Sequence, residues 1–270
     1  MADQVKYTSK LYRSRVLIVG GSAGVGYAVA EACIEQGADA VILSSSNNNR
    51  VQEAVARLRS SYPSKASHIS GFACDLAQED VLEDNITNLL NHASADRKYK
   101  LDHIAYTAGD AIVPRTVEDV NLEILKGMFL VRSFAAVLLA KHGIKYMTLS
   151  RTSSITFTSG ASDIRPLPAL PILSMLTGSM RGLVRGLANN LKPVRVNSVS
   201  LGAVSTYLLK GTWADKPPEQ REQIIGMFKS QALTGELALP EDVAEAYVYF
   251  MRDHNVTGVS VDSDSGRHII

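Results

Sequence analysis

Short apolar runs alternate with longer stretches of helical period along almost the whole chain. Each run is rich in branched aliphatic residues and is followed by glycine or by polar residues, which is typical of strands buried in a sheet. The expected strands cover residues 16–19, 40–43, 68–74, 101–107, 154–158, 194–199 and 258–261. The expected helices cover residues 24–36, 51–58, 79–93, 122–141, 175–191 and 241–251.

Alternation of strands and helices with short connections predicts an α/β fold. We expect a Rossmann-like, doubly wound parallel sheet of about seven strands with helices on both faces, in a single domain over residues 1–270. Residues 1–13 are interpreted as an N-terminal extension. Residues 205–235 are interpreted as a flap that covers the substrate, because they contain a Pro- and Lys-rich insert at 210–220.

The turn between the first strand and the first helix is rich in glycine. Glycines let the chain turn tightly and bring backbone amides and a helix N-terminus against a pyrophosphate, so this turn predicts a dinucleotide-binding loop. The alternative is a glycine-rich turn without a ligand. The residues expected to contact the cofactor here are Gly20, Ser22, Gly24, Val25 and Gly26.

The end of the second strand lacks the carboxylate that would bind the ribose of NAD. Ser45, Ser46, Asn47 and Arg50 stand there instead. Hydroxyls, an amide and a guanidinium can hold a 2′-phosphate by charge-assisted hydrogen bonds, which favours NADP as the cofactor. The alternative is a solvated polar loop in which Arg50 only begins the next helix.

Several motifs, in order, resemble those of the short-chain dehydrogenase/reductase family. They are the glycine loop, Asp75-Leu76, Thr107-Ala108-Gly109, and the segment from Arg195 to Thr206. The resemblance implies a homodimer or homotetramer that pairs through the helices at 122–141 and 175–191. It also implies cofactor contacts from Asp75, Leu76, Ala108, Gly109, Val204 and Thr206.

The departures from this family lie in its catalytic group of Asn, Ser and Tyr-x-x-x-Lys. Ser159 matches the serine, but the positions of the Tyr and the Lys fall at Leu173 and Thr177, and that of the Asn at Ile124. A placed general acid contributes roughly 10²–10⁴-fold to a rate. We therefore expect weak chemistry on ordinary ketones. The substrate would need only hydride, as an iminium does, or the pocket would perform a reaction other than redox.

Two charged residues are candidates to replace the lost groups beside Ser159. Asp110 follows the fourth strand, where ligands bind in open α/β sheets, and Arg132 interrupts an apolar helix. Asp110, Arg132 and Ser159 are the predicted catalytic residues, with the two charges paired or holding an intermediate together. The alternatives are a loop cap for Asp110 and a structural salt bridge for Arg132. Asp163 and Arg165 are further polar candidates.

The segments around Tyr106–Asp110 and Phe129–Phe134 resemble a narrower group, the atypical fungal reductases of secondary metabolism. That group includes NADPH-dependent reductase/Diels–Alderases without the Tyr and Lys. The resemblance implies an NADP(H)-dependent oxidoreductase acting on a small apolar substrate, with hydride transfer to C=N, C=C or an activated carbonyl. A cyclase or isomerase, and a non-catalytic cofactor-binding module, are the alternatives.

Composition removes several other classes of function. The net charge of +1 argues against a nucleic-acid partner, which requires a basic surplus. No apolar run approaches the roughly 20 residues that a membrane span needs, and we expect no signal peptide. Two cysteines and six scattered histidines show no metal-ligand spacing. A cytoplasmic protein without a metal is expected.

Overall fold

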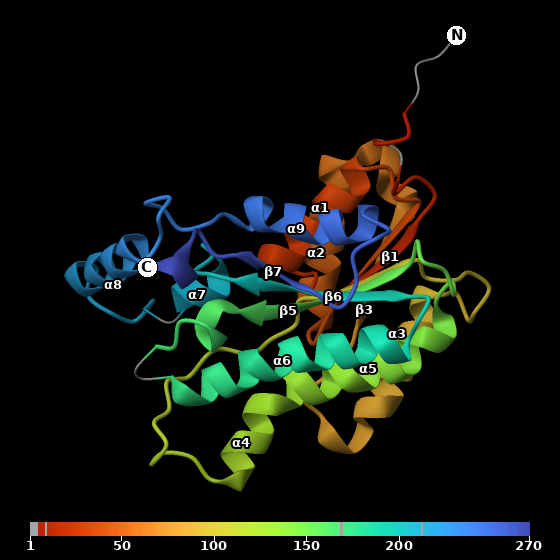
Figure 1. Ribbon diagram of the computed structural model, residues 1–270. Helices are drawn as coiled ribbons and strands as arrows, with labels where there is room; N and C mark the ends of the chain where they lie inside the picture. Colours follow the sequence, from red (N-terminus) through yellow and green to blue (C-terminus); the bar gives the residue numbers. More distant parts are fainter. Residues whose placement is uncertain (1–4, 9, 168–169, 212) are drawn as a thin grey trace.

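The computed structural model describes residues 5–8, 10–167, 170–211 and 213–270, and a parallel sheet runs through its centre (Figure 1). The strand order is β3-β2-β1-β4-β5-β6-β7, and every neighbouring pair is parallel. This arrangement confirms the predicted doubly wound α/β fold. The strands are β1 (Arg15–Val19), β2 (Ala40–Ser45), β3 (Ile69–Ala73), β4 (His103–Tyr106), β5 (Ser154–Gly160), β6 (Arg195–Leu201) and β7 (Ser260–Ser263).

Helices cover both faces of this sheet, with α1, α2 and α9 on one side and α3, α5 and α6 on the other (Figure 1). The α-helices are α1 (Gly24–Glu35), α2 (Asn48–Ser61), α3 (Leu82–Ala93), α4 (Leu122–Phe129), α5 (Ala135–Gly143), α6 (Pro171–Asn190), α7 (Tyr207–Gly211), α8 (Pro218–Ser230) and α9 (Pro240–Arg252). Shorter helical turns are η1 (Pro63–His68), η2 (Glu79–Val81), η3 (Leu130–Phe134), η4 (Ile144–Tyr146), η5 (Ala161–Asp163) and η6 (Arg267–Ile269).

β1 is buried on both faces, which explains why every residue after Arg15 in this strand is apolar. Successive side chains of a strand point to opposite faces, so Val16 and Ile18 of β1 enter the core under α1 and α9. Leu17 and Val19 enter the second core, under α3, α5 and α6. The two cores pack against opposite faces of the sheet and fix its register. The loops at its carboxyl edge therefore rest on a rigid support.

The helix expected over 122–141 is interrupted, which corrects that prediction. A π-helical segment, η3, separates α4 from α5. The buried hydroxyl of Tyr106 donates a hydrogen bond to the carbonyl oxygen of Val131 within this segment. A π turn shifts the side chains that follow it and is frequent at functional sites. Arg132 lies inside this segment.

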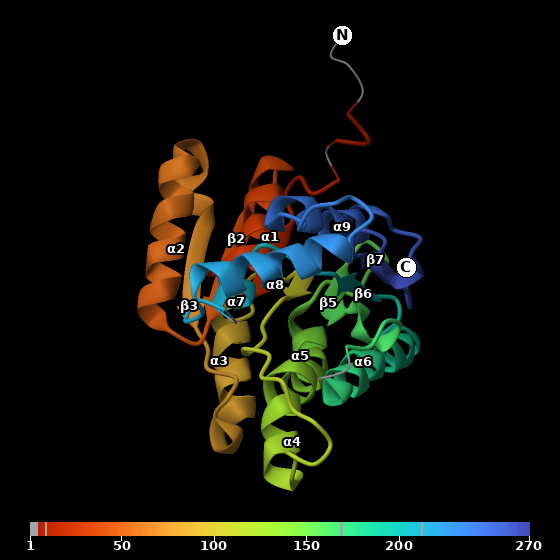
Figure 2. The same ribbon diagram turned by 90° about the vertical axis from the view of Figure 1, so that its left-hand side faces the viewer.

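Two helices were not expected from the sequence, in the region interpreted as a flap. α7 and α8 lack fully buried residues, so their sequences carry no strong apolar stripe for pattern reading to detect. Figure 2 shows α8 crossing in front of the sheet. Trp213 is buried and its ring packs 5.8 Å from that of Phe228. A substrate-covering role for this region stays a prediction.

The cysteines, membrane insertion and self-association were also the subject of predictions from the sequence. Cys33 and Cys74 are both buried and free. Within the described ranges, helices that combine the length and the apolar character needed to cross a bilayer do not occur. Self-association through α5 and α6 stays a prediction.

Buried His103 makes the fold sensitive to acid. Burial lowers the pKa of His103 to about 3, with the charges of Arg195 and His254 adding to the effect. The unfolded chain binds a proton at this residue below about pH 6.5, whereas the folded protein does not, so stability falls as the pH drops from 6.5 toward 3. His103→Gln should remove this dependence. Urea unfolding at about pH 7.5 and pH 5 should show the variant losing about 2 kcal/mol less than the wild type on acidification. Equal losses in both proteins would contradict this role of His103.

Candidate functional site

The glycine loop after β1 leaves no room for side chains at two positions. The amide of Gly20 donates to the carbonyl oxygen of Ser44, 2.8 Å away. A Cβ on Gly20 would lie 2.5 Å from the amide nitrogen of Ala108, and one on Gly26 would lie 2.4 Å from Oγ1 of Thr107. Glycine at these positions therefore lets the loop after β1 pack directly against the loop after β4.

The segment after β6 packs against the start of α1. Thr206 places its Cγ2 3.1 Å from where a Cβ on Gly24 would lie. Val204 is buried and forms an isolated bridge with Ala238, which fixes the chain before α7. Val25 is buried in the first turn of α1. The structure thus brings together the predicted cofactor residues of these two distant segments.

The loop between β2 and α2 has the features of an anion site. The side-chain oxygen of Asn47 accepts from the amide of Arg50, 3.0 Å away, and caps α2. The guanidinium of Arg50 donates to the hydroxyl of Ser46 at 3.0 Å. The hydroxyl oxygen of Ser45 is buried without a hydrogen-bond partner among residues 5–8, 10–167, 170–211 and 213–270. A helix N-terminus, an exposed guanidinium and a buried unpartnered hydroxyl lie within a few residues of one another.

Arg57 belongs to the same region and was missed from the sequence. Its Nη2 donates to the carbonyl oxygen of Ser22 at 3.2 Å, and its guanidinium lies 4.6 Å from the ring centroid of Tyr27. Arg57 follows Arg50 by seven residues, two turns of α2, so both extend from the same side of that helix. This spacing was the signal that could have identified it.

Asp75, which follows β3, shapes its own loop. Its carboxylate accepts from the amide of Ala77 at 3.0 Å and from Nε2 of Gln78 at 3.1 Å. Leu76 beside it is buried. Both carboxylate oxygens of Asp75 therefore accept hydrogen bonds within the turn. A ligand at this loop would contact the backbone or the side chains next to Asp75.

These loops together fit an extended dinucleotide. Gly20 and Gly26 leave no room for a Cβ, so the backbone of the glycine loop stays close to the loop after β4, and the Ser45 hydroxyl has no hydrogen-bond partner among the described residues. Gly20–Gly26 would hold the pyrophosphate at the N-terminus of α1. The loops after β2 and β3 would hold the adenosine half, and those after β4, β5 and β6 the nicotinamide half.

Arg132 reaches the loop after β4 from the π segment. A Cβ on Gly109 would lie 2.6 Å from the guanidinium carbon of Arg132, so the guanidinium packs on that glycine. Its Nη2 donates to the backbone carbonyl oxygen of Asp110. Burial lowers the pKa of Arg132, while the charges of Asp110 and Tyr106 oppose the shift. The expected pairing is therefore corrected: Arg132 contacts the backbone of Asp110 rather than its exposed carboxylate.

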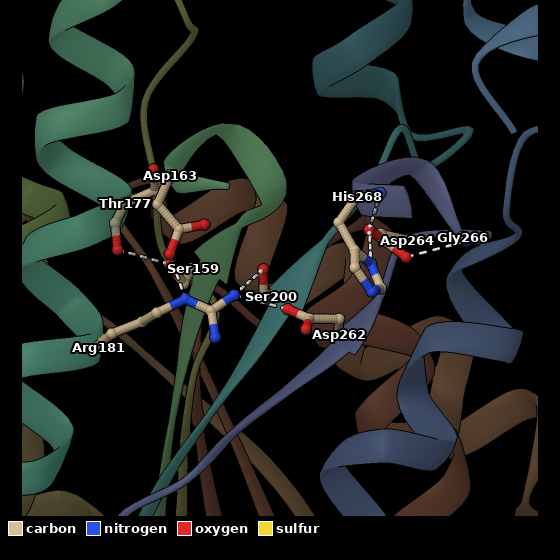
Figure 3. A network of polar contacts seen from close by, with 9 residues as sticks. All are labelled: Ser159, Asp163, Thr177, Arg181, Ser200, Asp262, Asp264, Gly266 and His268. Carbon is tan, nitrogen blue, oxygen red and sulfur yellow. Dashed lines mark hydrogen bonds and ion pairs between the residues drawn. The ribbon is translucent and has the colours of Figure 1, made fainter. Parts of the chain in front are cut away.

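Ser159, on β5, faces α6 rather than Asp110 or Arg132. Its hydroxyl donates to the carbonyl oxygen of Thr177 at 3.0 Å (Figure 3). The Thr177 hydroxyl in turn donates to the carbonyl oxygen of Leu173 at 2.9 Å. Thr177 thus contacts Ser159, and Leu173 lies one helical turn before Thr177 on α6; these are the positions that the family resemblance assigns to the Lys and the Tyr, respectively. Neither can supply a proton or a positive charge there.

A charge network lies next to this group (Figure 3). Arg181 of α6 pairs through Nε with Asp163 and through Nη2 with Asp262 of β7 at 2.7 Å. Burial alone would lower the pKa of Arg181, but its bonds to the two carboxylates outweigh this effect and raise it. Oδ1 of Asp163 is buried and has no hydrogen-bond partner within the part of the chain that the structure describes. The network holds two carboxylates and one guanidinium, so it carries one surplus negative charge.

The Arg181 network was not predicted, although Asp163 was noted as a polar candidate. Arg181 follows Thr177 by four residues and so lies on the same face of α6. Asp163 is close to that face, because a Cβ on Gly178 would lie 3.7 Å from the Cβ of Asp163. Asp262 comes from the opposite end of the chain. The contacts of Arg181 with the two aspartates depend on tertiary structure, which the spacing of residues along the sequence does not show.

Comparisons with known proteins agree with this architecture. The profile of the SDR-like Rossmann domain matches residues 7–270. The short-chain dehydrogenase/reductase fsr5 of Gibberella fujikuroi is 35% identical over 271 residues, covering 98% of both chains. The short-chain dehydrogenase/reductase malC of Malbranchea aurantiaca is 37% identical over 268 residues, again covering 98% of both. The structure of MalC reductase/Diels–Alderase from that organism superimposes with a TM-score of 0.90, covering 98% of this chain and 100% of the other. The chain is therefore a member of the short-chain dehydrogenase/reductase family of oxidoreductases.

Proposed function

We propose that this protein is an NADP(H)-dependent reductase that transfers hydride to a positively charged C=N bond of a small apolar substrate. The observation that carries the proposal is the surplus negative charge of the Arg181 network beside Ser159, in which Oδ1 of Asp163 has no hydrogen-bond partner among the described residues. A buried unpaired carboxylate oxygen is costly unless a ligand satisfies it. A cationic group can do so.

Preference for NADP is supported by the loop after β2. Residues 44–50 contain no carboxylate that would repel a 2′-phosphate. Arg50 lies beside the Ser46 hydroxyl, and Arg57 approaches from the next turns of α2 toward Ser22. Two guanidinium groups, the Ser45 hydroxyl and the N-terminus of α2 would bind a dianionic phosphate by charge-assisted hydrogen bonds.

An iminium suits this site because its reduction requires no acid. NADPH supplies a hydride when bound, and hydride addition to a cationic C=N carbon gives a neutral amine. A ketone would instead give an alkoxide, which needs the proton that the family's Tyr provides. Leu173 and Thr177 cannot replace the Tyr as a general acid. Asp163, whose carboxylate is positioned by Arg181, would stabilise the bound cation.

Arg132 would organise the wall of the substrate pocket. Its guanidinium holds the loop after β4 through Gly109 and the carbonyl of Asp110. It remains charged at neutral pH and would also attract a carbonyl oxygen or anionic group of the substrate. Exposed apolar side chains from the loops after β4 and β5 and from α7 favour an apolar substrate body; they are Val113, Val117, Ile164, Tyr207 and Leu208.

Cyclisation is a second candidate function. The MalC structure, described as a reductase/Diels–Alderase, matches this chain with a TM-score of 0.90 at 35% identity. An enzyme of this kind would use the shape and charge of the same pocket to close a ring. A cyclised product formed without net consumption of NADPH would favour this candidate over the first.

The cofactor assignment predicts a difference between NADPH and NADH. Calorimetry should show tighter binding of NADPH, and Arg50→Leu and Arg57→Leu should each weaken it about tenfold, since one charge-assisted hydrogen bond contributes about 1.5–3 kcal/mol before solvent screening. Binding of NADH should not change in either variant. Arg185→Leu, an exposed change on α6, is the matched control. Equal or tighter binding of NADH by the wild type would refute the NADP preference.

The assignment of Asp163 predicts selectivity for a permanent cation. N-methyl-3,4-dihydroisoquinolinium should be reduced with one NADPH consumed per product, whereas its neutral analogue 1-tetralone should react poorly. Asp163→Asn should raise the KM for the cation about tenfold, because it removes a charge interaction of about 1.4 kcal/mol. The variant should leave NADPH affinity unchanged. Equal KM values for the cation in wild type and variant would contradict the role of Asp163.

The proposed role of Arg132 predicts a loss of activity without loss of the fold. Arg132→Leu should lower kcat/KM for the iminium about 10- to 100-fold, corresponding to about 1.4–2.7 kcal/mol of transition-state stabilisation. Arg132→Lys should lose less, because it keeps the charge but not the planar contact with Gly109. Circular dichroism and NADPH binding verify folding. Full activity in a folded Arg132→Leu protein would rule this role out.

A further inference from the structure

A cavity of about 490 Å³ lies between three segments that are far apart in the sequence. It is lined by residues 165–167 of the loop after η5, residues 230–231 at the end of α8, and residues 267 and 270 of the C-terminal segment. Its volume is within the range of small-molecule sites. It is formed by other residues than those assigned above to the cofactor or to the Arg181 network.

Arg267 forms a fixed wall of this cavity. Its side chain is only 8% exposed, although it carries a charge. Its Nε donates to Oε1 of Gln231 at 3.1 Å and its Nη2 donates to the carbonyl oxygen of Arg165 at 3.1 Å. These bonds leave Nη1 without a hydrogen-bond partner among the described residues. The guanidinium is thus fixed by two hydrogen bonds, and its Nη1 group can donate to a ligand.

Two guanidinium groups, those of Arg165 and Arg267, lie on the wall of this cavity. Across the described part of the chain, ion pairs to Arg165 or Arg267 do not occur. Asp264 is the carboxylate that acts on Arg267, yet its oxygens accept from the amides of Gly266 and His268 and from Nδ1 of His268. Burial lowers the pKa of Arg267, Asp264 opposes this shift and Arg165 adds to it.

We propose that this cavity binds a small molecule that carries a carboxylate on an apolar body. The carboxylate would pair with Arg165 and with the free donor of Arg267, in the fork geometry that guanidinium groups favour. Pro166, Leu167 and Ile270 offer apolar contacts to the rest of the ligand. The site does not depend on the proposed reductase function.

A carboxylate fits this wall better than a phosphate for an electrostatic reason. α8 ends at Ser230, on the lining of the cavity, and the carboxyl end of a helix carries partial negative charge. A dianion would be repelled there more strongly than a monoanion. An inorganic phosphate would also leave the apolar part of the lining in contact with water.

The probe pair indole-3-acetate and indole-3-acetamide tests this proposal on the full chain. Calorimetry with NADPH present should show the acetate binding at least about tenfold more tightly than the amide, as one retained ion pair of about 1.4 kcal/mol requires. Arg165→Gln, an exposed change, should reduce acetate affinity to that of the amide. Arg185→Gln on α6 is the matched control and should leave it unchanged. Arg267→Lys should weaken acetate binding as well, by removing the forked contact.

Three results would overturn the proposal. The first is equal affinity for the acetate and the amide, or no binding of either. The second is acetate binding that persists unchanged in Arg165→Gln, because the carboxylate would then bind elsewhere. The third is binding of inorganic phosphate as tight as that of the acetate, which would show a plain anion site. NADPH affinity, measured in the same experiments, separates these outcomes from a failure of the cofactor assignment.

Discussion

Parallel pairing of β1, β4, β5 and β6 is the constraint on which the rest of this protein depends. β1, β4 and β6 place buried apolar side chains in both cores, whereas β5 places them in the core under α3, α5 and α6, so apolar packing helps to fix the register of all four strands. Their carboxyl ends meet at one edge, and every loop of the candidate site starts there. The close approach of Gly20 and Gly26 to the loop after β4 is possible only because this edge is rigid.

Electrostatics at this edge separate the protein from a typical carbonyl reductase. The positions that the family resemblance assigns to a proton donor and a lysine hold Leu173 and Thr177, and the backbone of Thr177 contacts Ser159. The ion-paired groups next to Ser159 are Arg181 and its two carboxylates, and this network has one surplus negative charge. Such a site stabilises a cation better than a developing alkoxide. The substrate class proposed above follows from this change in the sign of the charge.

Sequence pattern was sufficient for the features that depend on local order. The β-branched runs located the strands, and the glycine loop located the start of α1, because both signals lie within a few consecutive residues. The π segment around Arg132 could not be found this way, since the hydrogen bond from Tyr106 to Val131 joins two separate elements. The Arg181–Asp262 pair spans 81 residues for the same reason. Of the two arrangements expected for Asp110 and Arg132, a charge pair or a joint hold on an intermediate, the structure replaces the first with a hydrogen bond from Arg132 to the Asp110 carbonyl oxygen.

We propose that hydride is transferred to a cationic C=N carbon bound beside Ser159 and Asp163. NADPH deuterated at the C4 position of its nicotinamide, supplied with N-methyl-3,4-dihydroisoquinolinium, tests this most directly. Mass spectrometry of the amine should show one deuterium at the former C=N carbon when the label is on the transferred face, and none when it is on the other face. Product without deuterium from either labelled form, or no reduction of the cation by the folded, NADPH-bound protein, would contradict the account.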